Sequence, residues 1–368
     1  MSVALGDPVK IGQVQFSFLP YPNVTLERVS IGAEPYATAA VIRIIPSPLW
    51  LVAATPVLSD VSLHNVLIRS QGLLRSGRWF SGGDGIAVRG VHLDGLAVEV
   101  GDATVGGLSG SVRMAATGSL DRILLQNAER SLSVTVVPSA AGDRLSVTSN
   151  GWALPFKPGL HFEYLEAQGE LTAGRLWFSK IDGQMYEGIF SGTALFDWSQ
   201  GVSLVSDIDL RHGSLSKLFT ALDPDLALEG DISGKLHLES RAASFGGLLD
   251  RLRADGDFVV ARGVIKHFDL VEAVRSGRPT RGGYTRFERF SGSLQLAQQG
   301  YQLSRLDISS GPMQAVGDLD IDRNRQLRGM MEVSLKGTAT LVRGSVQIAG
   351  TLKDPRLTRL SGISRDAP

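Results

Sequence analysis

The stretch GDLDIDRN contains the residues whose types and spacing most resemble a metal site: Asp318, Asp320 and Asp322. A calcium loop of the EF-hand type also needs glycine at its sixth position and glutamate at its twelfth. This chain has Arg323 and Gly329 there. A leucine and an isoleucine alternate with the aspartates, as in a strand with one polar and one apolar face. We therefore predict a solvated strand face and no metal ion.

Other residues that could carry chemistry form no recognisable constellation. The histidines are His64, His92, His161, His212, His237 and His267, and none pairs with another at metal-ligand spacing. The chain has no Gly-Lys-Ser/Thr loop, no Gly-x-Gly-x-x-Gly and no Gly-x-Ser-x-Gly elbow. We predict a non-enzymatic protein with no cofactor. An enzyme that acts on carbohydrate through paired carboxylates is the weakest alternative, because no such pair can be recognised.

One group of charges attracts attention, in the stretch VRSGRPTRGGYTRFERF. It contains Arg275, Arg278, Arg281, Arg286 and Arg289. Guanidinium groups bind phosphate bidentately, so Arg278, Arg281 and Arg286 could contact lipid head groups. The alternative is a solvated loop after a helix, with nearby glutamates offsetting part of the charge.

Composition narrows the class of protein. The chain has 368 residues, long enough for two domains or one elongated repeat structure. Lysine plus arginine and aspartate plus glutamate both number 37, so no global field would attract nucleic acid. Cysteine is absent, which removes disulfides and thiolate metal sites. Glycine numbers 43 and aromatic residues make up only 7%, a balance typical of many short strands joined by tight turns.

Alternation with a period of two recurs from end to end. In VRGSVQIAGTL, Val342, Val346 and Ile348 alternate with polar residues, which predicts a strand with one apolar face. Turn dipeptides such as Gln299-Gly300 and Ser310-Gly311 separate similar runs. The pattern predicts a meander of roughly eighteen antiparallel strands.

Helical patterns are few and short. We expect helices over residues 48–54, 120–129, 215–222, 245–253 and 268–275, with N-caps at Ser119, Ser214 and Ser244.

The apolar faces of so many strands must be covered, since each buried side chain contributes about 1.5 to 3 kcal/mol. A few short helices cannot cover them all. A sandwich, a closed barrel, a solenoid or an apolar groove with a guest molecule would each satisfy the pattern. The predicted lining of such a surface is Phe290, Leu294, Leu296, Met313, Leu319, Ile321, Met331, Val333, Leu335, Val346, Ile348 and Leu352. The alternative for these residues is a plain core between two sheets.

The order of several pieces resembles the AsmA-like proteins of Gram-negative bacteria. The pieces near the start are LGDPVKIGQVQFSFLPYPNVTLERVSIG and LWLVAATPVLSDVSLHNVLI. The pieces near the end are LEGDISGKLHLES, FGGLLDRLRADGDFVVARGVIKHFDLVEAV, TRFERFSGSLQLAQQGYQLSRLDISSGPMQAVGDLDID and GSVQIAGTLKDPRL. The resemblance covers both ends and about half of the chain, whereas the middle, from Gly101 to Gly213, resembles the family only in its general pattern. It divides the chain into an N-terminal module (1–100), central groove repeats (101–213) and a C-terminal module (214–368).

This resemblance implies a periplasmic protein anchored in the inner membrane, whose apolar β-groove shields phospholipid acyl chains and supports outer-membrane lipid homeostasis. Family members have a transmembrane helix just before the LGDPVKIG strand, so the resemblance predicts an anchor upstream of Met1. It further implies phospholipids, the inner membrane and an outer-membrane or periplasmic protein as partners.

The combined prediction is an elongated, mainly antiparallel β protein, curled into an apolar groove, with a few short helices. Its predicted function is non-enzymatic lipid binding and transfer. The alternative function is that of a structural or assembly factor that pairs its sheet edge with an outer-membrane protein.

Overall fold

In the computed structural model, the described residues form a single 22-stranded sheet. It describes residues 7–47, 57–69, 72, 87–88, 90–100, 103–115, 120–140, 142–154, 159–172, 174–223, 226, 228–244, 246–276, 278–298, 300–337 and 341–360.

The strands in chain order are β1 (Val9–Ser17), β2 (Asn23–Ile31), β3 (Ala37–Pro46), β4 (Val57–Arg69), β5 (Ala87–Val88), β6 (Gly90–Val100), β7 (Ala103–Met114), β8 (Leu120–Asn127), β9 (Leu132–Val137), β10 (Asp143–Ala153), β11 (His161–Thr172), β12 (Arg175–Met185), β13 (Gly188–Asp197), β14 (Val202–Ser214), β15 (Leu228–Ala242), β16 (Arg253–Lys266), β17 (Tyr284–Ala297), β18 (Gly300–Ser310), β19 (Met313–Asp322), β20 (Leu327–Lys336), β21 (Leu341–Gly350) and β22 (Pro355–Leu360).

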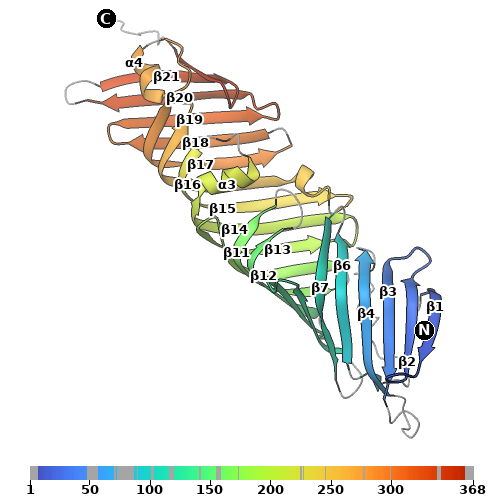
Figure 1. The fold of residues 1–368 in the computed structure, drawn as a ribbon. Helices are drawn as coiled ribbons and strands as arrows, with labels where there is room; N and C mark the ends of the chain where they lie inside the picture. The colour runs from blue at the N-terminus through green and yellow to red at the C-terminus, as the bar shows by residue number, and fades with distance from the viewer. Residues whose placement is uncertain are drawn as a thin grey trace, which may run out of the picture.

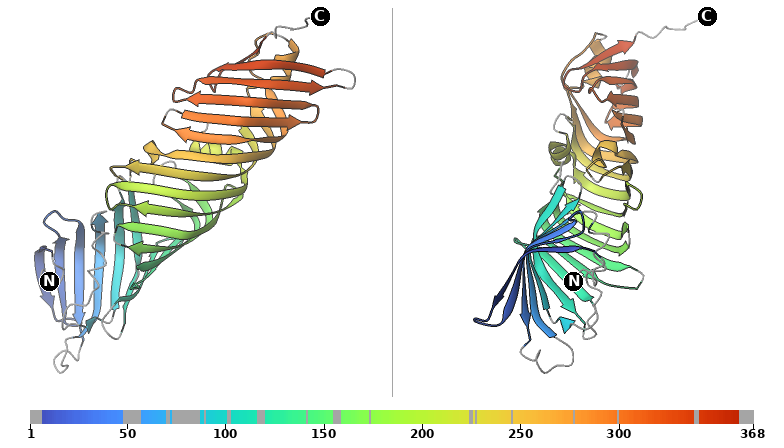
Figure 2. Two further views of the ribbon diagram at one scale, coloured as in Figure 1. Left: turned by 180° about the vertical axis from the view of Figure 1, so that it is seen from behind. Right: turned by 90° about the vertical axis from the view of Figure 1, so that its right-hand side faces the viewer.

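Successive strands pair antiparallel along almost the whole sheet. The exception is β4, which pairs in parallel with β5 and β6. In the described part, the only strand that pairs with β1 is β2 and the only strand that pairs with β22 is β21, although Leu357 of β22 also forms an isolated bridge with Thr280. Figures 1 and 2 show a long curled sheet with its first and last strands at opposite ends. The predicted fold class, an open antiparallel sheet that curls into a groove, is confirmed.

Helices occupy few of the described residues: α3 (Leu215–Leu222), α4 (Leu270–Ser276) and the short 3-10 helix η3 (Leu249–Arg251). The predicted helix over 215–222 is confirmed, and the one over 268–275 is confirmed with a start two residues later. Ser214 is the N-cap of α3, although its side chain makes no capping hydrogen bond. The helix predicted over 48–54 and the N-cap predicted at Ser119 lie outside the described residues.

The helix predicted over 120–129 is wrong, because this segment forms β8. Leu120, Ile123 and Leu124 have helical spacing, but β8 pairs on both sides, with β7 and β9. The ladder alternates side chains between the two faces, so Ile123 and Leu125 share the apolar face while Leu124 is exposed. Pairing with two neighbouring strands overrides a weak local preference.

The helix predicted over 245–253 is also largely wrong. Only η3 forms, and β16 begins directly after it at Arg253. Two glycines, Gly246 and Gly247, precede η3, and glycine in a helix is about 1 kcal/mol less favourable than alanine. Ser244 therefore caps no helix and accepts a turn hydrogen bond from the Gly247 N–H through its carbonyl.

The register keeps one face apolar along the entire sheet. Phe16 opposes Val24 at the N-terminal edge, Ile208 opposes Leu236 in the middle, and Ile348 opposes Leu357 at the C-terminal edge. Side chains that are directly opposed on neighbouring strands point to the same side. We call this side the apolar face and the other the polar face.

At several positions the regular strand pairing is interrupted, and the sheet bends there; we call such a bend a crease. At one level across β1–β6 the pairing skips Arg28, Asn65 and Gly95, each with a positive φ angle between 51° and 71°. A break of this kind lets residues three apart, such as Leu26 and Val29, face the same side, and it bends the strand. His212, Arg262 and Arg305 mark similar breaks in β14, β16 and β18.

Apolar residues beside the N-terminal crease form a buried cluster. Its buried members are Leu26, Val29, Ala39, Ile42, Val66, Leu96, Leu108 and Leu132. Partly buried residues as far along the chain as Trp152 pack against it. The cluster therefore extends beyond residue 100, and β14 ends at Ser214, one residue past the 213/214 division.

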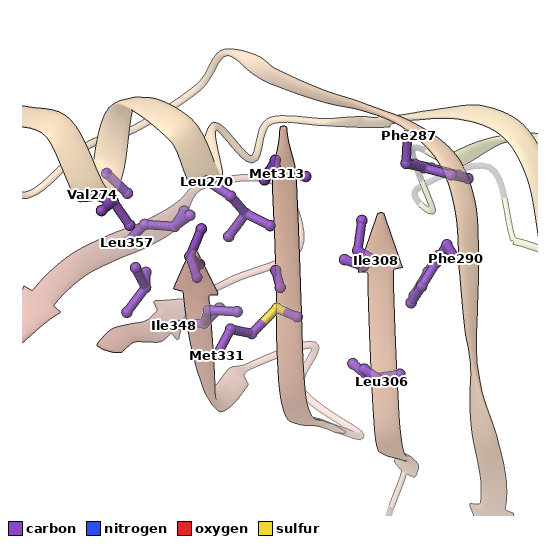
Figure 3. Close-up of a cluster of buried hydrophobic side chains, with 14 of the residues drawn as sticks. Leu270, Val274, Phe287, Phe290, Leu306, Ile308, Met313, Met331, Ile348 and Leu357 are labelled. Carbon is purple, nitrogen blue, oxygen red and sulfur yellow. The ribbon is translucent and has the colours of Figure 1, made fainter. Parts of the chain in front are cut away.

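The C-terminal part of the apolar face is covered by the chain itself. Leu270, Ala273 and Val274 of α4 pack into a cluster with residues of β16–β22 and with Leu215 of α3. Figure 3 shows Leu270 and Val274 pointing toward the strand side chains. Asp223, just after α3, accepts two hydrogen bonds of 2.8 Å from Arg325 beside β19. Both helices are thus held over this end of the sheet.

Close strand packing requires glycine at Gly234 in β15. A Cβ built there would lie 2.5 Å from the Asp257 carbonyl oxygen on β16. Such a contact forces a shift of backbone, which cannot yield as a flexible side chain would.

We expect Gly234→Ala to lower the free energy of unfolding by about 1–3 kcal/mol, because the added methyl group overpacks the β15–β16 contact. Urea unfolding followed by circular dichroism measures the change. Gly106→Ala in β7 is the control, because a Cβ there meets its nearest atom, Ala97 Cβ, at an ordinary 3.5 Å. Equal midpoints for the two variants would contradict the close approach.

We expect Leu270→Ala to destabilise the protein by about 2–5 kcal/mol, because it opens a cavity under α4. Leu270 is 1% exposed, whereas Leu249 in η3 is 45% exposed and provides the matched control. Leu249→Ala should change the stability by no more than about 0.5 kcal/mol. A comparable loss in both variants would show that α4 does not seal this end.

Candidate functional site

The described residues leave part of the middle of the apolar face uncovered. Partly exposed large side chains come from β11–β15 and β17 and lie beside the buried Phe162 and Phe190. The partly exposed side chains are Leu165, Leu176, Phe178, Ile181, Phe196, Ile208, Leu210, Leu236, Leu238, Leu294 and Leu296, which we call the middle face.

Strand register brings these residues together. One row runs across the strands from Ile181 through Gly192, Ile208 and Leu236 to Gly256. The two glycines carry no side chain, so the surface is recessed at these positions relative to the larger apolar side chains of the row. An apolar surface with recesses of this kind can accept a flexible hydrocarbon chain. Its side chains are hydrocarbon groups, which neither transfer protons nor bind metal ions.

The middle face lies between two sealed regions. None of its residues belongs to the buried clusters at either end or to the small cluster of Val202, Ala242 and Leu248 in the described part of the chain. Of the described helices, α4 packs over β20–β22, and α3 contacts β15 and β14 but has its apolar residues in the C-terminal cluster and not against the middle face. Apolar side chains here remain in contact with solvent unless another molecule covers them.

The residues predicted to line a groove separate into two groups. Leu294 and Leu296 belong to the middle face. The others pack in the C-terminal cluster, where Phe290, Met313, Ile321, Met331, Val333, Leu335, Val346 and Ile348 are buried and Leu319 and Leu352 are partly buried. They share the predicted face, but α4 covers it. For these residues the arrangement is that of a packed core.

Sequence reasoning missed most of the middle face. The segment from Gly101 to Gly213 offered only alternation without a sharp motif. One signal was present: β10–β13 follow each other with short connections and no intervening helical pattern. A stretch of strands with no helix to cover them is where an apolar face stays open.

The arginine group is not gathered at the middle face. Arg281 forms an ion pair with Asp354 at 3.6 Å, beside β22. Arg286 lies on the polar face of β17, with its guanidinium carbon 5.5 Å from the centre of the Tyr284 ring. Arg278 is exposed after α4, and its N–H donates to the Ser276 Oγ. The structure therefore spreads these side chains over the C-terminal end.

The polar face carries ion pairs across neighbouring strands. His237 Nδ1 lies 2.7 Å from Asp207 Oδ1, and its Nε2 lies 3.1 Å from Glu239 Oε1. Hydrogen bonds to Asp207 and then Glu239 raise the pKa of His237. These groups are exposed, and exposed pairs contribute little to stability.

A second polar-face group shows the opposite shift. The Ser199 hydroxyl, the Ser199 N–H and the Arg175 guanidinium hydrogen-bond to Asp197 and lower its pKa to about 2. Because the folded pKa is depressed, this stabilisation is present above the pKa of the unfolded chain and disappears as the pH falls through about 2.

The aspartates of GDLDIDRN are on the polar face of β19, as predicted. Asp318 Oδ1 accepts the Arg305 N–H at 2.9 Å, and Asp322 Oδ1 accepts the Gln326 N–H at 2.9 Å. In the described part of the chain, no group of three histidine, aspartate or glutamate side chains could hold a metal ion.

The fold and the site define a class of protein: a curled, open β-sheet with an apolar groove and a solvated polar face. No protein-family model, curated protein or solved structure matches the chain. Among the described helices, none has the length and apolar character needed to cross a bilayer.

We expect the pKa of His237 to lie above its usual value of about 6.5, because protonation completes the hydrogen bonds to Asp207 and Glu239. The raised pKa favours the folded state below the unfolded pKa, and this contribution is lost as the pH rises through the folded pKa. Nuclear magnetic resonance titration measures it, with His237→Gln to assign the signal.

Asp207→Asn should lower this pKa, whereas Asp209→Asn, which removes a charge paired with Arg211, should change it less. A His237 pKa that does not respond to Asp207→Asn would contradict the assigned contact.

Proposed function

We propose that this protein is a non-enzymatic lipid-binding and transfer protein, with a groove that shields phospholipid acyl chains from water. The observation that carries the proposal is the middle face, a row of partly exposed apolar side chains between two sealed clusters. An apolar guest would complete the burial that the chain leaves unfinished.

The size of the middle face suits an acyl chain. Neighbouring strands are about 4.8 Å apart, so the distance from β11 to β17 is about 29 Å. The acyl chains of one bilayer leaflet fill about 15 Å, half of a hydrocarbon core about 30 Å thick. The middle face is therefore long enough for the chains of one phospholipid, with the head group left in water at the rim.

The driving force is removal of hydrocarbon from water. Each methylene group that leaves water contributes about 0.8 kcal/mol, and apolar side chains of the middle face gain in the same way. Binding of this kind has no directional requirement. It supports recognition of acyl chains in general and makes no choice among head groups.

The resemblance to AsmA-like proteins supports the same proposal from the sequence side. It adds a periplasmic location, attachment to the inner membrane and a contribution to outer-membrane lipid homeostasis. The arginines named above are not part of this proposal, because they lie away from the middle face and one is paired with Asp354.

The proposal predicts that Ile208→Glu lowers affinity for a fluorescent phospholipid at least tenfold, because a carboxylate beside an acyl chain loses its hydration. Ile208 lies in the central row of β14, opposite Gly192 and Leu236. Titration of the purified variant with a monomeric short-chain fluorescent phospholipid measures the loss.

Val205→Glu is the matched control, since Val205 is an exposed aliphatic residue on the polar face of the same strand. It should bind lipid as the unsubstituted protein does, and circular dichroism should show both variants folded. Equal binding by the two folded variants would remove the middle face from the proposal. Native mass spectrometry of gently purified protein should also reveal bound phospholipid.

A second function has one observation in its favour. In the described part of the chain β1 is an edge strand, and nearly all of its residues are exposed. An assembly factor could add a strand of an outer-membrane protein there. Lipid-free protein that forms a stable complex through β1 would favour this alternative over lipid transfer.

A further inference from the structure

The β1–β2 hairpin carries an unusual concentration of exposed apolar side chains. The most exposed large apolar residues in the described part of the chain are Leu19 (84%), Phe18 (77%), Phe16 (72%) and Tyr21 (70%). They fall within six consecutive positions, so they form a patch. Single exposed apolar residues are common on soluble proteins, whereas a contiguous patch marks a surface that contacts another molecule.

This patch is free of charge. No aspartate, glutamate, lysine or arginine occurs between Lys10 and Glu27. On the polar side of the hairpin, Gln15 donates to Glu27 at 3.3 Å. The tip of the hairpin is therefore apolar, aromatic and uncharged, and the nearest charged residues in the sequence are Lys10 and Glu27.

The shape of the tip limits what can cover it. A strand added to the edge of β1 would pair with the backbone of Val9–Ser17. It would not extend to Phe18, Leu19 and Tyr21, which lie in the turn beyond the strand, where Pro20 and Pro22 have no N–H to donate. Edge pairing alone therefore leaves the patch exposed.

A second copy of the chain is also a poor fit. Aromatic side chains bury about 150–250 Å² each, so the exposed part of the tip amounts to about 500–600 Å². An interface of standard size buries about 800 Å² from each partner, so the tip by itself falls short of one. The hydrocarbon boundary of a bilayer has no such requirement, and it accepts aromatic and leucine side chains at a depth of about 5–10 Å.

We propose that the β1–β2 hairpin tip, residues 16–21, is a membrane-docking element that inserts Phe16, Phe18, Leu19 and Tyr21 into the surface of a lipid bilayer. Insertion depends on apolar contact and not on charge, so neutral phosphatidylcholine is a sufficient surface. This element acts whether or not the groove holds lipid.

The hairpin is also continuous with the apolar face. Val14 and Phe16 oppose Leu26 and Val24, which belong to the N-terminal cluster. Where the protein transfers lipid, as proposed above, the docked tip would hold this end of the apolar face against the membrane. That consequence rests on the proposed function, whereas the docking itself does not.

The test is co-flotation of the protein with phosphatidylcholine vesicles at low and high salt. The unsubstituted protein should float with the vesicles at both salt concentrations, and Phe18→Ser combined with Leu19→Ser should reduce the bound fraction at least tenfold. The control combines Trp177→Ser and Ile189→Ser, which remove exposed apolar residues of β12 and β13. It should float as the unsubstituted protein does.

A labelled tip provides a second readout. The chain contains no cysteine, so Leu19→Cys and Ser199→Cys each give one attachment point for an environment-sensitive dye. Vesicles should raise and blue-shift the emission of the dye at position 19 and leave the dye at position 199 unchanged.

Three results would overturn the docking proposal. The first is protein that stays in the aqueous phase. The second is binding that needs anionic lipid and disappears at high salt. The third is a dimer in sedimentation velocity that the tip substitutions disperse while vesicle binding is absent. The tip variant should keep its affinity for monomeric short-chain phospholipid, so a failed groove and a failed tip give different results.

Discussion

One constraint governs this structure: a continuous sheet of 22 strands has one apolar face, and that face must be covered from edge to edge. The chain meets the constraint in different ways along its length. At the N-terminal end the creased strands bring their own apolar residues together. At the C-terminal end α4 and α3 cover the strands. Between the two, the residues of the middle face belong to neither buried cluster.

The crease explains how so large a sheet curls without closing into a barrel. A regular strand turns alternate residues to opposite faces, so an unbroken strand does not bring residues three apart to the same side. Breaks at Arg28, Asn65 and Gly95 give the strands an extra residue at one level and bend them there. Apolar side chains on both sides of the bend then meet across the concavity. The same device recurs at Arg262 and Arg305 in the C-terminal half.

The polar face and the apolar face have different kinds of specificity. Ion pairs such as Arg175–Asp197 and Lys180–Asp182 are exposed and individually weak, so the polar face contributes solubility more than stability. The middle face relies on the summed area of many side chains. Such a surface does not depend on any one residue, and the sequence over it contains no sharp motif.

Local sequence was sufficient for the antiparallel sheet, because period-two alternation and glycine turns act between neighbouring strands. It was also sufficient for α3 and α4, whose apolar spacing agrees with their packing. It was misleading over residues 120–129, where leucines at helical spacing became β8 once strands paired on both sides.

Tertiary structure alone decided which part of the apolar face is open. Val346 and Leu294 both alternate as strand residues, yet Val346 is buried in the C-terminal cluster and Leu294 is partly exposed. Alternation reports which side of a strand a residue faces, but it carries no information about what lies over that side. Coverage depends on where the sheet bends and on where α4 returns across it, and both are set by contacts between residues far apart in the chain.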